Sequence, residues 1–180
     1  KIIITGGLGY IGSELCKLYS GYSWHHKVIV VDNRFISERV NQIRNWNIGY
    51  FNGDILDKDF VEMHFKDADV VHHLAGITDV PRTKSQSDLE KDKQIKIVAE
   101  KGTQNILDTI NDKCKIIFPS THVVYEGINK VKIDIKEEEN TQPVLSYSSS
   151  KAFNEKQLKE SGKNYVILRL GSVYGYSNDT

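Results

Sequence analysis

The sequence predicts an α/β fold in which helices cover both faces of a doubly wound parallel sheet. Short apolar runs rich in β-branched residues alternate with longer amphipathic stretches along the 180 residues. The runs are continuous and do not alternate with period two, which is typical of strands covered on both faces. Repeated alternation of strand and helix indicates βαβ units, whose right-handed crossovers place helices on both sides of one sheet.

Six strands are expected, each justified by its own apolar run. They span residues 1–5, 27–32, 48–51, 69–74, 115–118 and 165–170. Helices are expected between them because the intervening segments are polar or amphipathic and long enough for several turns. They span residues 11–20, 36–46, 57–66, 87–111 and 146–161. Apolar or small residues at 95, 98, 99, 102, 106 and 110 form a helical stripe in the fourth of them.

Composition excludes several classes of protein. The chain has 24 basic and 24 acidic side chains, so its zero net charge gives no electrostatic footprint for nucleic acid or an anionic membrane. Its 39% apolar content is too high for a disordered chain, and no run approaches the roughly 20 apolar residues that span a bilayer. The length fits one domain, residues 1–180. Cys16 and Cys114 form no metal-ligand pair and indicate a reducing, cytoplasmic compartment, and no metal is expected.

A glycine-rich turn after the first strand predicts a phosphate-binding site. Gly6, Gly9 and Gly12 are spaced G-x-x-G-x-x-G and lead into the first helix. Glycines allow a sharp turn and a close backbone approach to a pyrophosphate, while the helix N-terminus offers free N–H groups. A tight turn without a ligand is the alternative, and the strand–turn–helix context favours the Rossmann-type dinucleotide site over it.

Asp32 supports a dinucleotide and indicates which one. It closes the second strand, where a carboxylate can accept hydrogen bonds from the adenosine ribose hydroxyls. The same carboxylate would repel a 2′-phosphate, so NAD is favoured over NADP. Arg34, two residues on, could bind a 2′-phosphate, so NADP is the alternative cofactor. The structural alternative for Asp32 is an ordinary carboxylate at the end of a strand.

Further motifs follow in an order that resembles the extended short-chain dehydrogenase/reductase family, of the NAD-dependent nucleotide-sugar epimerase/dehydratase type. Gly53-Asp54-Ile55 follows the third strand, and His73-Leu74-Ala75-Gly76 ends the fourth. Ser120–Tyr125 follows the fifth strand in the place of the family's Ser/Thr-bearing segment. Tyr147–Lys151 matches Y-x-x-x-K, and Arg169–Gly175 resembles R-x-x-N-V-Y-G.

The resemblance implies an enzyme like UDP-glucose 4-epimerase, with a nucleotide-sugar substrate. Tyr147 would take a proton from a sugar hydroxyl while a hydride passes transiently to NAD. Lys151, one helical turn on, would hold the nicotinamide ribose and lower the pKa of the Tyr147 phenol. Thr121 would hydrogen-bond the reacting oxygen. Family members often form homodimers through the helices at 87–111 and 146–161, although the stripe could instead face the sheet.

The candidate catalytic residues are therefore Thr121, Tyr147 and Lys151. The candidate cofactor-binding residues, beside Tyr147 and Lys151, are Gly6, Gly9, Tyr10, Ile11, Gly12, Asp32, Asn33, Asp54, Ile55, Leu74, Ala75, Gly76 and Thr78. Each catalytic candidate also has a structural alternative. Thr121 could be a strand-end hydroxyl, Tyr147 a half-buried aromatic residue of a helix, and Lys151 a solvated charge.

Departures from the family pattern narrow the expected function. Ala99 and Ser172 stand where the family has Asn. His122 and Val123 replace the Asp-Glu pair of the 4,6-dehydratases, which argues against water elimination because Val has no acid–base group. The family's C-terminal substrate domain is missing, so the chain is expected to be the N-terminal part of a longer enzyme. A sugar or carbonyl reductase or dehydrogenase of the same family is one alternative, and a dinucleotide-binding or sensing module that is not an enzyme is the other.

Overall fold

The computed structural model describes residues 1–78 and 88–175, and its centre is a six-stranded sheet with the order β3-β2-β1-β4-β5-β6. The strands are β1 (Ile2–Thr5), β2 (Val28–Asp32), β3 (Gly49–Asn52), β4 (Val70–His73), β5 (Lys115–Thr121) and β6 (Asn164–Leu170). Every neighbouring pair is parallel. The predicted doubly wound parallel sheet is confirmed.

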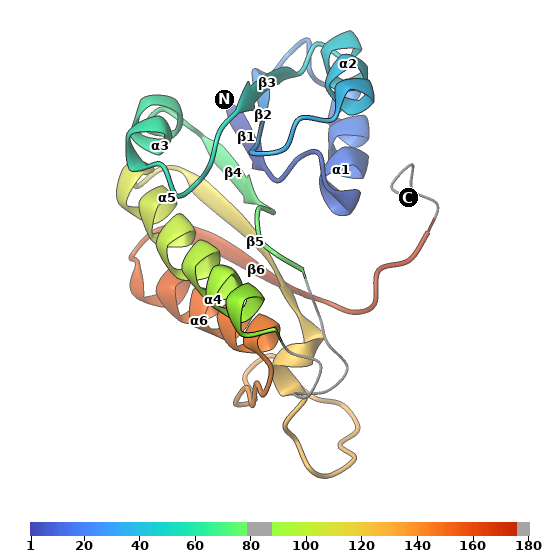
Figure 1. Cartoon of the computed structure of the whole chain (residues 1–180), viewed down its shortest axis with the longest axis vertical. Coiled ribbons are helices and arrows are strands. Elements are labelled where there is room, and N and C mark those ends of the chain that lie inside the picture. The colour runs from blue at the N-terminus through green and yellow to red at the C-terminus, as the bar shows by residue number, and fades with distance from the viewer. Residues whose placement is uncertain (79–87, 176–180) are drawn as a thin grey trace.

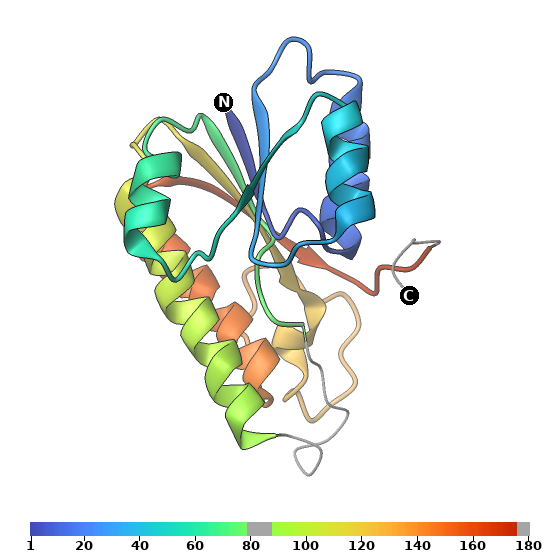
Figure 2. The ribbon, with the colours of Figure 1, turned by 45° about the horizontal axis from the view of Figure 1, so that its top comes forward.

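Helices cover the sheet from two sides (Figures 1 and 2). On one side lie α1 (Tyr10–Ser20) and α2 (Ser37–Asn45). On the other lie α3 (Lys58–Phe65), α4 (Leu89–Ile97), α5 (Thr103–Thr109) and α6 (Ser146–Glu160). A 3₁₀ turn, η3 (His122–Tyr125), follows β5 directly.

Two hydrophobic cores explain the continuous apolar runs of the central strands. In β1, Ile3 belongs to the core with α3, α5 and α6, while Ile2 and Ile4 belong to the core with α1 and α2. Successive side chains of a strand point to opposite faces, so a strand with helices on both sides needs apolar residues at every position. All four residues of β1 and all five of β2 are buried.

The same expectation is wrong for the two edge strands. Only one residue of β3 is even partly buried, and β6 has no fully buried residue among the seven. An apolar run identifies a strand but does not reveal whether it has neighbours on both sides. Tyr165, Val166 and Leu168 of β6 consequently keep 37–44% of their surface exposed.

The helix predicted over residues 87–111 is interrupted, and its first residue, 87, lies outside the described residues. A π-helical turn, η2 (Val98–Gly102), separates α4 from α5. The predicted stripe nevertheless faces the protein interior, since Ile95, Ile106 and Ile110 are 3% exposed or less. The structure therefore supports the sheet-facing reading of the stripe.

Both cysteines, Cys16 and Cys114, are free and buried. Within residues 1–78 and 88–175, no helix has the length and apolar character needed to cross a bilayer.

Candidate active site

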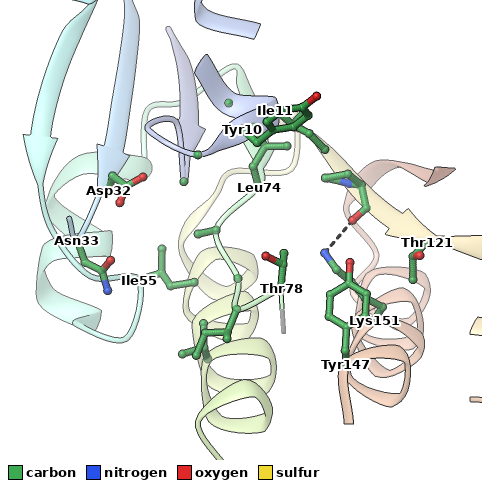
Figure 3. A pocket seen from close by; sticks show the side chains of 18 of the residues that line it. Tyr10, Ile11, Asp32, Asn33, Ile55, Leu74, Thr78, Thr121, Tyr147 and Lys151 are labelled. Atoms are coloured by element: carbon green, nitrogen blue, oxygen red, sulfur yellow. Dashed lines mark hydrogen bonds between the residues drawn. The ribbon is translucent and has the colours of Figure 1, made fainter. Parts of the chain in front are cut away.

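A cleft of about 680 Å³ opens at the carboxyl ends of the strands, where the strand order reverses between β1 and β4. Ligands of open α/β sheets bind at this type of switch point. All the candidate residues predicted from the sequence line this one cleft. Figure 3 shows Asp32, Asn33 and Ile55 at one end, Thr121, Tyr147 and Lys151 at the other, and Leu74 and Thr78 between them.

The glycine turn forms one wall and admits no side chain at two positions. Gly6 has a φ of +65°, and a Cβ there would lie 2.8 Å from the backbone N of Ala75. A Cβ on Gly12 would lie 2.5 Å from the carbonyl oxygen of Gly6. These contacts are with backbone atoms, so neither glycine can be replaced without moving α1 or the end of β4.

The N-terminus of α1 provides donors for an anion. Its N-cap, Gly9, offers no side-chain cap, and its first turn holds no acidic residue. The first-turn N–H groups of a helix lack acceptors within the helix. Tyr10, Ile11 and Gly12 occupy that turn and line the cleft. Uncapped N–H groups and the positive end of the helix dipole fit a pyrophosphate.

Asp32 is 5% exposed and is held at the end of β2. Its Oδ2 accepts from the backbone N of Leu8 at 3.0 Å, so it fastens the glycine turn to the strand. Its Oδ1 accepts from the backbone N and the Nε of Arg34 at 3.0 and 3.3 Å. The ribose carboxylate predicted from the sequence is therefore partly engaged by Arg34, a cleft residue whose side chain is 56% exposed.

The end of the cleft beside β3 is formed by Asn33, Asp54 and Ile55. Asn33 donates to Asp54 Oδ2 at 3.2 Å, while Oδ1 accepts from the backbone N of Leu56 at 2.9 Å. The pair thus joins the segment after β2 to the segment after β3. It leaves Ile55, an apolar side chain, beside two polar groups, a combination that suits a flat heterocycle with polar edges.

Lys151 lies at the opposite end with its ammonium group directed at the strand end. Its Nζ donates to the carbonyl oxygen of Pro119 at 2.8 Å, the bond drawn in Figure 3. The same atom lies 4.5 Å from the centre of the Phe118 ring and 5.9 Å from that of the Tyr147 ring. Burial lowers the pKa of Lys151 from its usual 10.5 to about 8.

The predicted lowering of the Tyr147 pKa is wrong for this structure. Burial raises the pKa of Tyr147 above its ordinary value. Lys151 faces the aromatic ring and donates a hydrogen bond to Pro119, so its charge does not offset the burial of the phenol. Thr121, which is 8% exposed, accepts from the backbone N of Val123 at 3.3 Å.

A buried polar chain connects the cleft to α6. Thr5 Oγ1 accepts from the backbone N of Ala75 at 3.0 Å and lies 3.0 Å from His73 Nδ1. His73 Nε2 lies 2.9 Å from Thr103 Oγ1, which also accepts from Asn154 at 3.0 Å. Burial, with the charge of Lys151 as a lesser cause, lowers the pKa of His73 to about 3. The ring is therefore neutral and acts as a structural link.

A buried ion pair anchors β6 to α6. Arg169 donates from Nε and Nη2 to the two carboxylate oxygens of Glu155 at 2.9 and 2.6 Å. Ser120 donates to the same carboxylate at 2.6 Å. Burial acts to raise the pKa of Glu155, but these hydrogen bonds and the charge of Arg169 outweigh it and leave the pKa below its usual value. The pair fixes β6, whose last residue, Leu170, lines the cleft.

Comparison with known proteins decides the family. The profile of the NAD dependent epimerase/dehydratase family matches residues 2–180. The chain belongs to this family. The predicted resemblance is thereby confirmed.

Individual relatives of this epimerase/dehydratase chain agree with the assignment. A putative UDP-glucose 4-epimerase of Methanocaldococcus jannaschii is 34% identical over 99% of the chain and 57% of its own length. A dTDP-D-glucose 4,6-dehydratase of Dictyostelium discoideum is 30% identical over 97% of the chain and 44% of its own length. The chain thus spans about half the length of the curated relatives it matches.

A solved structure supports the fold in the same way. The UDP-glucose 4-epimerase of Thermus thermophilus, in complex with NAD, superposes with a TM-score of 0.74 at 26% identity. The match covers 93% of this chain and 54% of that one.

Some residues of the cleft were not among the site residues predicted from the sequence. Arg34 and Gly53 lie beside or within the recognised motifs, as do Ser120, Leu170, Gly171 and Val173, so motif position could have pointed to them. Pro119 contributes a backbone carbonyl, and Val98 is one apolar residue of a helical stripe, so neither carries a residue-type signal. The remaining additional residues that line the cleft are Val31 and Ile77. Within the described residues, no group of His, Cys, Asp and Glu could hold a metal ion.

Proposed function

We propose that residues 1–180 are the NAD-binding domain of a nucleotide-sugar epimerase similar to UDP-glucose 4-epimerase. The single observation that carries the proposal is that Thr121, Tyr147 and Lys151 line the same cleft as the glycine turn and Asp32. A proton-transfer group and a dinucleotide cradle in one cleft suit oxidation and reduction of a hydroxyl carbon.

The donor set of the cleft fits NAD. The first turn of α1 suits the pyrophosphate, the Asp32 carboxylate suits the adenosine ribose, and the Asn33–Asp54 end suits the adenine. We assign these groups, with Leu74, Ala75, Gly76 and Thr78 along the floor, to cofactor binding. When bound, NAD supplies reversible acceptance of a hydride from the sugar carbon.

Proton transfer falls to Tyr147 in this proposal. In its deprotonated form, the phenolate oxygen takes the proton from the sugar hydroxyl as that carbon is oxidised and returns it when the carbon is reduced. Lys151 supplies positive charge behind the tyrosine ring, and Thr121 hydrogen-bonds the reacting oxygen. Two residues after Thr121, where the dehydratases carry their second acidic residue, Val123 supplies no acid or base, so this position favours epimerisation over elimination of water.

The experiment follows the transient, enzyme-bound NADH by its absorbance in a single turnover after UDP-glucose or UDP-galactose is mixed with the NAD-loaded protein, on wild type and Tyr147→Phe. Phe keeps the ring but lacks the proton-transfer oxygen. We expect the variant to bind NAD with wild-type affinity and to lose reduction. A variant that reduces NAD at the wild-type rate would refute Tyr147 as the base. Absence of NAD binding by the wild type would refute both the enzyme and the dinucleotide-sensor readings.

Substrate choice separates this proposal from its enzyme alternative. A reductase or dehydrogenase of the same family would turn over a free sugar or carbonyl compound, releasing oxidised or reduced cofactor stoichiometrically. An epimerase leaves the total NAD unchanged while interconverting the two sugar nucleotides. Product analysis by chromatography distinguishes them.

A homodimer is a further part of the proposal. Ile97 of α4 and Phe153 of α6 keep 43% and 40% of their surface exposed, on two helices that pack against each other. Sedimentation equilibrium of wild type and an Ile97→Glu, Phe153→Glu variant tests it. A wild type that sediments as a monomer at all concentrations would refute it.

A further inference from the structure

The helix that carries Tyr147 and Lys151 begins with only one local cap, the Ser148 Oγ, which accepts from the backbone N of Leu145 at 3.2 Å. The N-cap of α6 is Leu145, whose side chain makes no capping hydrogen bond. Leucine is among the poorest N-cap residues because it has no acceptor for the free N–H groups of the first turn. Tyr147 lies in that first turn, so whatever holds the turn also sets the position of the phenol.

Glu126, from another part of the chain, accepts from the segment that leads into α6 and from a side chain of its first turn. Its Oε1 accepts from the backbone N of Val144 at 2.8 Å and from that of Leu145 at 2.7 Å. The hydroxyl of Ser148 donates to the same oxygen. These donors come from both sides of Tyr147, and one of them is the residue directly after it. The carboxylate also carries its negative charge to the positive end of the helix dipole.

The backbone of Glu126 is connected to Thr121 through Val123. The 3₁₀ turn η3 begins at the residue after Thr121, and the backbone N of Glu126 donates to the carbonyl oxygen of Val123 at 3.1 Å to close that turn. Thr121 Oγ1 in turn accepts from the backbone N of Val123. Two backbone hydrogen bonds to Gln142 hold the loop on either side of Glu126. The backbone N of Gln142 donates to the carbonyl oxygen of Val124, and the backbone N of Gly127 donates to the carbonyl oxygen of Gln142, both at 2.8 Å.

We propose that Glu126 is a positioning residue that sets the distance and orientation of Tyr147 relative to Thr121. It connects the turn after β5 to the first turn of α6, and it is not itself one of the residues that line the cleft. The inference rests on the proposed function for its catalytic meaning. Its structural part, that Glu126 holds the start of α6, stands on the hydrogen bonds alone.

Glu126 is charged when it does this. Burial acts to raise its pKa, but the hydrogen bonds from Ser148, Leu145 and Val144 together outweigh that effect and keep the pKa below its usual value. An uncharged acceptor of the same shape is therefore a sharp probe of whether geometry or charge matters. Glu126→Gln keeps the acceptor oxygen, whereas Glu126→Ala removes it.

The first measurement is amide hydrogen exchange on the full chain, which requires no turnover. Glu126→Ala should speed exchange at Val144 and Leu145, whose amides donate to Glu126, and leave the rest of α6, 152–160, unchanged. Glu126→Gln should restore slow exchange. The matched control is Glu138→Ala, which removes an exposed carboxylate from the same connection between η3 and α6. Unchanged exchange at Val144 and Leu145 in Glu126→Ala would overturn the proposal.

The second measurement is kinetic, with NAD and UDP-glucose as the probes. Because displacement of a catalytic group by about 1 Å can cost up to about 100-fold in rate, we expect kcat to fall at least about 10-fold in Glu126→Ala. KM and the Kd for NAD should stay within about twofold, and Glu126→Gln should recover most of the rate. An unchanged kcat, or loss of NAD affinity in parallel with kcat, would overturn the proposal.

The two measurements distinguish failure of the proposed function from failure of the positioning role of Glu126. If the wild type does not bind NAD, the proposed function fails, and the exchange result still decides whether Glu126 holds the start of α6. If the wild type is active and Glu126→Ala changes neither exchange nor kcat, the positioning role fails while the proposed function survives.

Discussion

Lys151 should make the stability of the protein depend on pH in a specific way, and Lys151→Met tests it. In the unfolded chain this lysine keeps a pKa near 10.5, whereas burial lowers it to about 8 in the fold. Below pH 8 both states are charged, and the buried charge opposes folding. Between pH 8 and 10.5 the folded protein has released the proton and the unfolded chain has not, so stability increases with pH.

The size of the effect follows from these two values. The buried charge costs about 3 kcal/mol at pH 7, since one pKa unit corresponds to about 1.4 kcal/mol. Raising the pH from about 7 to about 9.5 should recover about 2 kcal/mol of it. Met fills a similar volume without the charge, so the variant lacks this gain.

The assay is urea unfolding of both proteins at several pH values between about 7 and about 9.5. The quantity to follow is the wild-type free energy of unfolding minus that of Lys151→Met, because other titrating groups cancel in this difference. It should rise by about 2 kcal/mol. Lys156→Met, an exposed lysine on the same helix, is the matched control. A difference for Lys151→Met that stays flat across this range would refute the argument that burial sets its protonation.

Three further predictions concern the walls and anchors of the cleft. Glu155→Gln should lower the free energy of unfolding by about 3 kcal/mol in urea titrations, because it leaves the largely covered Arg169 guanidinium without its charged partner; a loss below about 1 kcal/mol would contradict this. Gly12→Ala should cost about 1–3 kcal/mol and weaken NAD binding, measured by calorimetry, because its Cβ would overlap Gly6. Gly21→Ala, with open space around it, is the control, and equal effects would argue against the clash. Asp32→Ala should weaken NAD binding roughly 10-fold or more and reduce discrimination against NADP in fluorescence titrations of NADH and NADPH; unchanged affinities would remove Asp32 from the site.

The central sheet could be predicted because burial on both faces imposes a pattern that a single strand displays. In β1 and β2 every position meets one core or the other, and the sequence shows it as an unbroken apolar run. The edge strands carry similar runs, and their exposure depends on neighbours that the run does not encode. The sequence therefore located β3 and β6 while leaving their environment unknown.

The π-helical turn was missed because the pattern of apolar residues does not distinguish it from a continuous helix. A Cβ on Gly102 would lie 2.4 Å from Cδ1 of Ile55, so this helix runs unusually close to the segment after β3. Helical periodicity over residues 95–110 changes little when one turn widens. Nothing local distinguishes the interrupted helix from a continuous one.

Recognition of the cleft from the sequence succeeded for groups whose residue type is itself the signal. Glycines at fixed spacing, a strand-end carboxylate and a Tyr–Lys pair are chemically distinctive. Glu126 was not found because its partners are two backbone N–H groups and a serine, 18 to 22 residues away. The Lys151 bond to the Pro119 carbonyl was invisible for the same reason, and without it the effect on Tyr147 was misjudged.

The order of the strands has a consequence for folding as well as for binding. The cleft is lined by residues from Gly6 to Val173, and its walls come from the ends of several different strands. Parallel neighbours pair only after a long loop has closed, so contacts of this kind form late and slowly. A ligand that contacts all walls of the cleft therefore binds only when the sheet is complete. At a concentration of about 100 times its Kd, such a ligand would add about 2.7 kcal/mol to the free energy of unfolding of the protein.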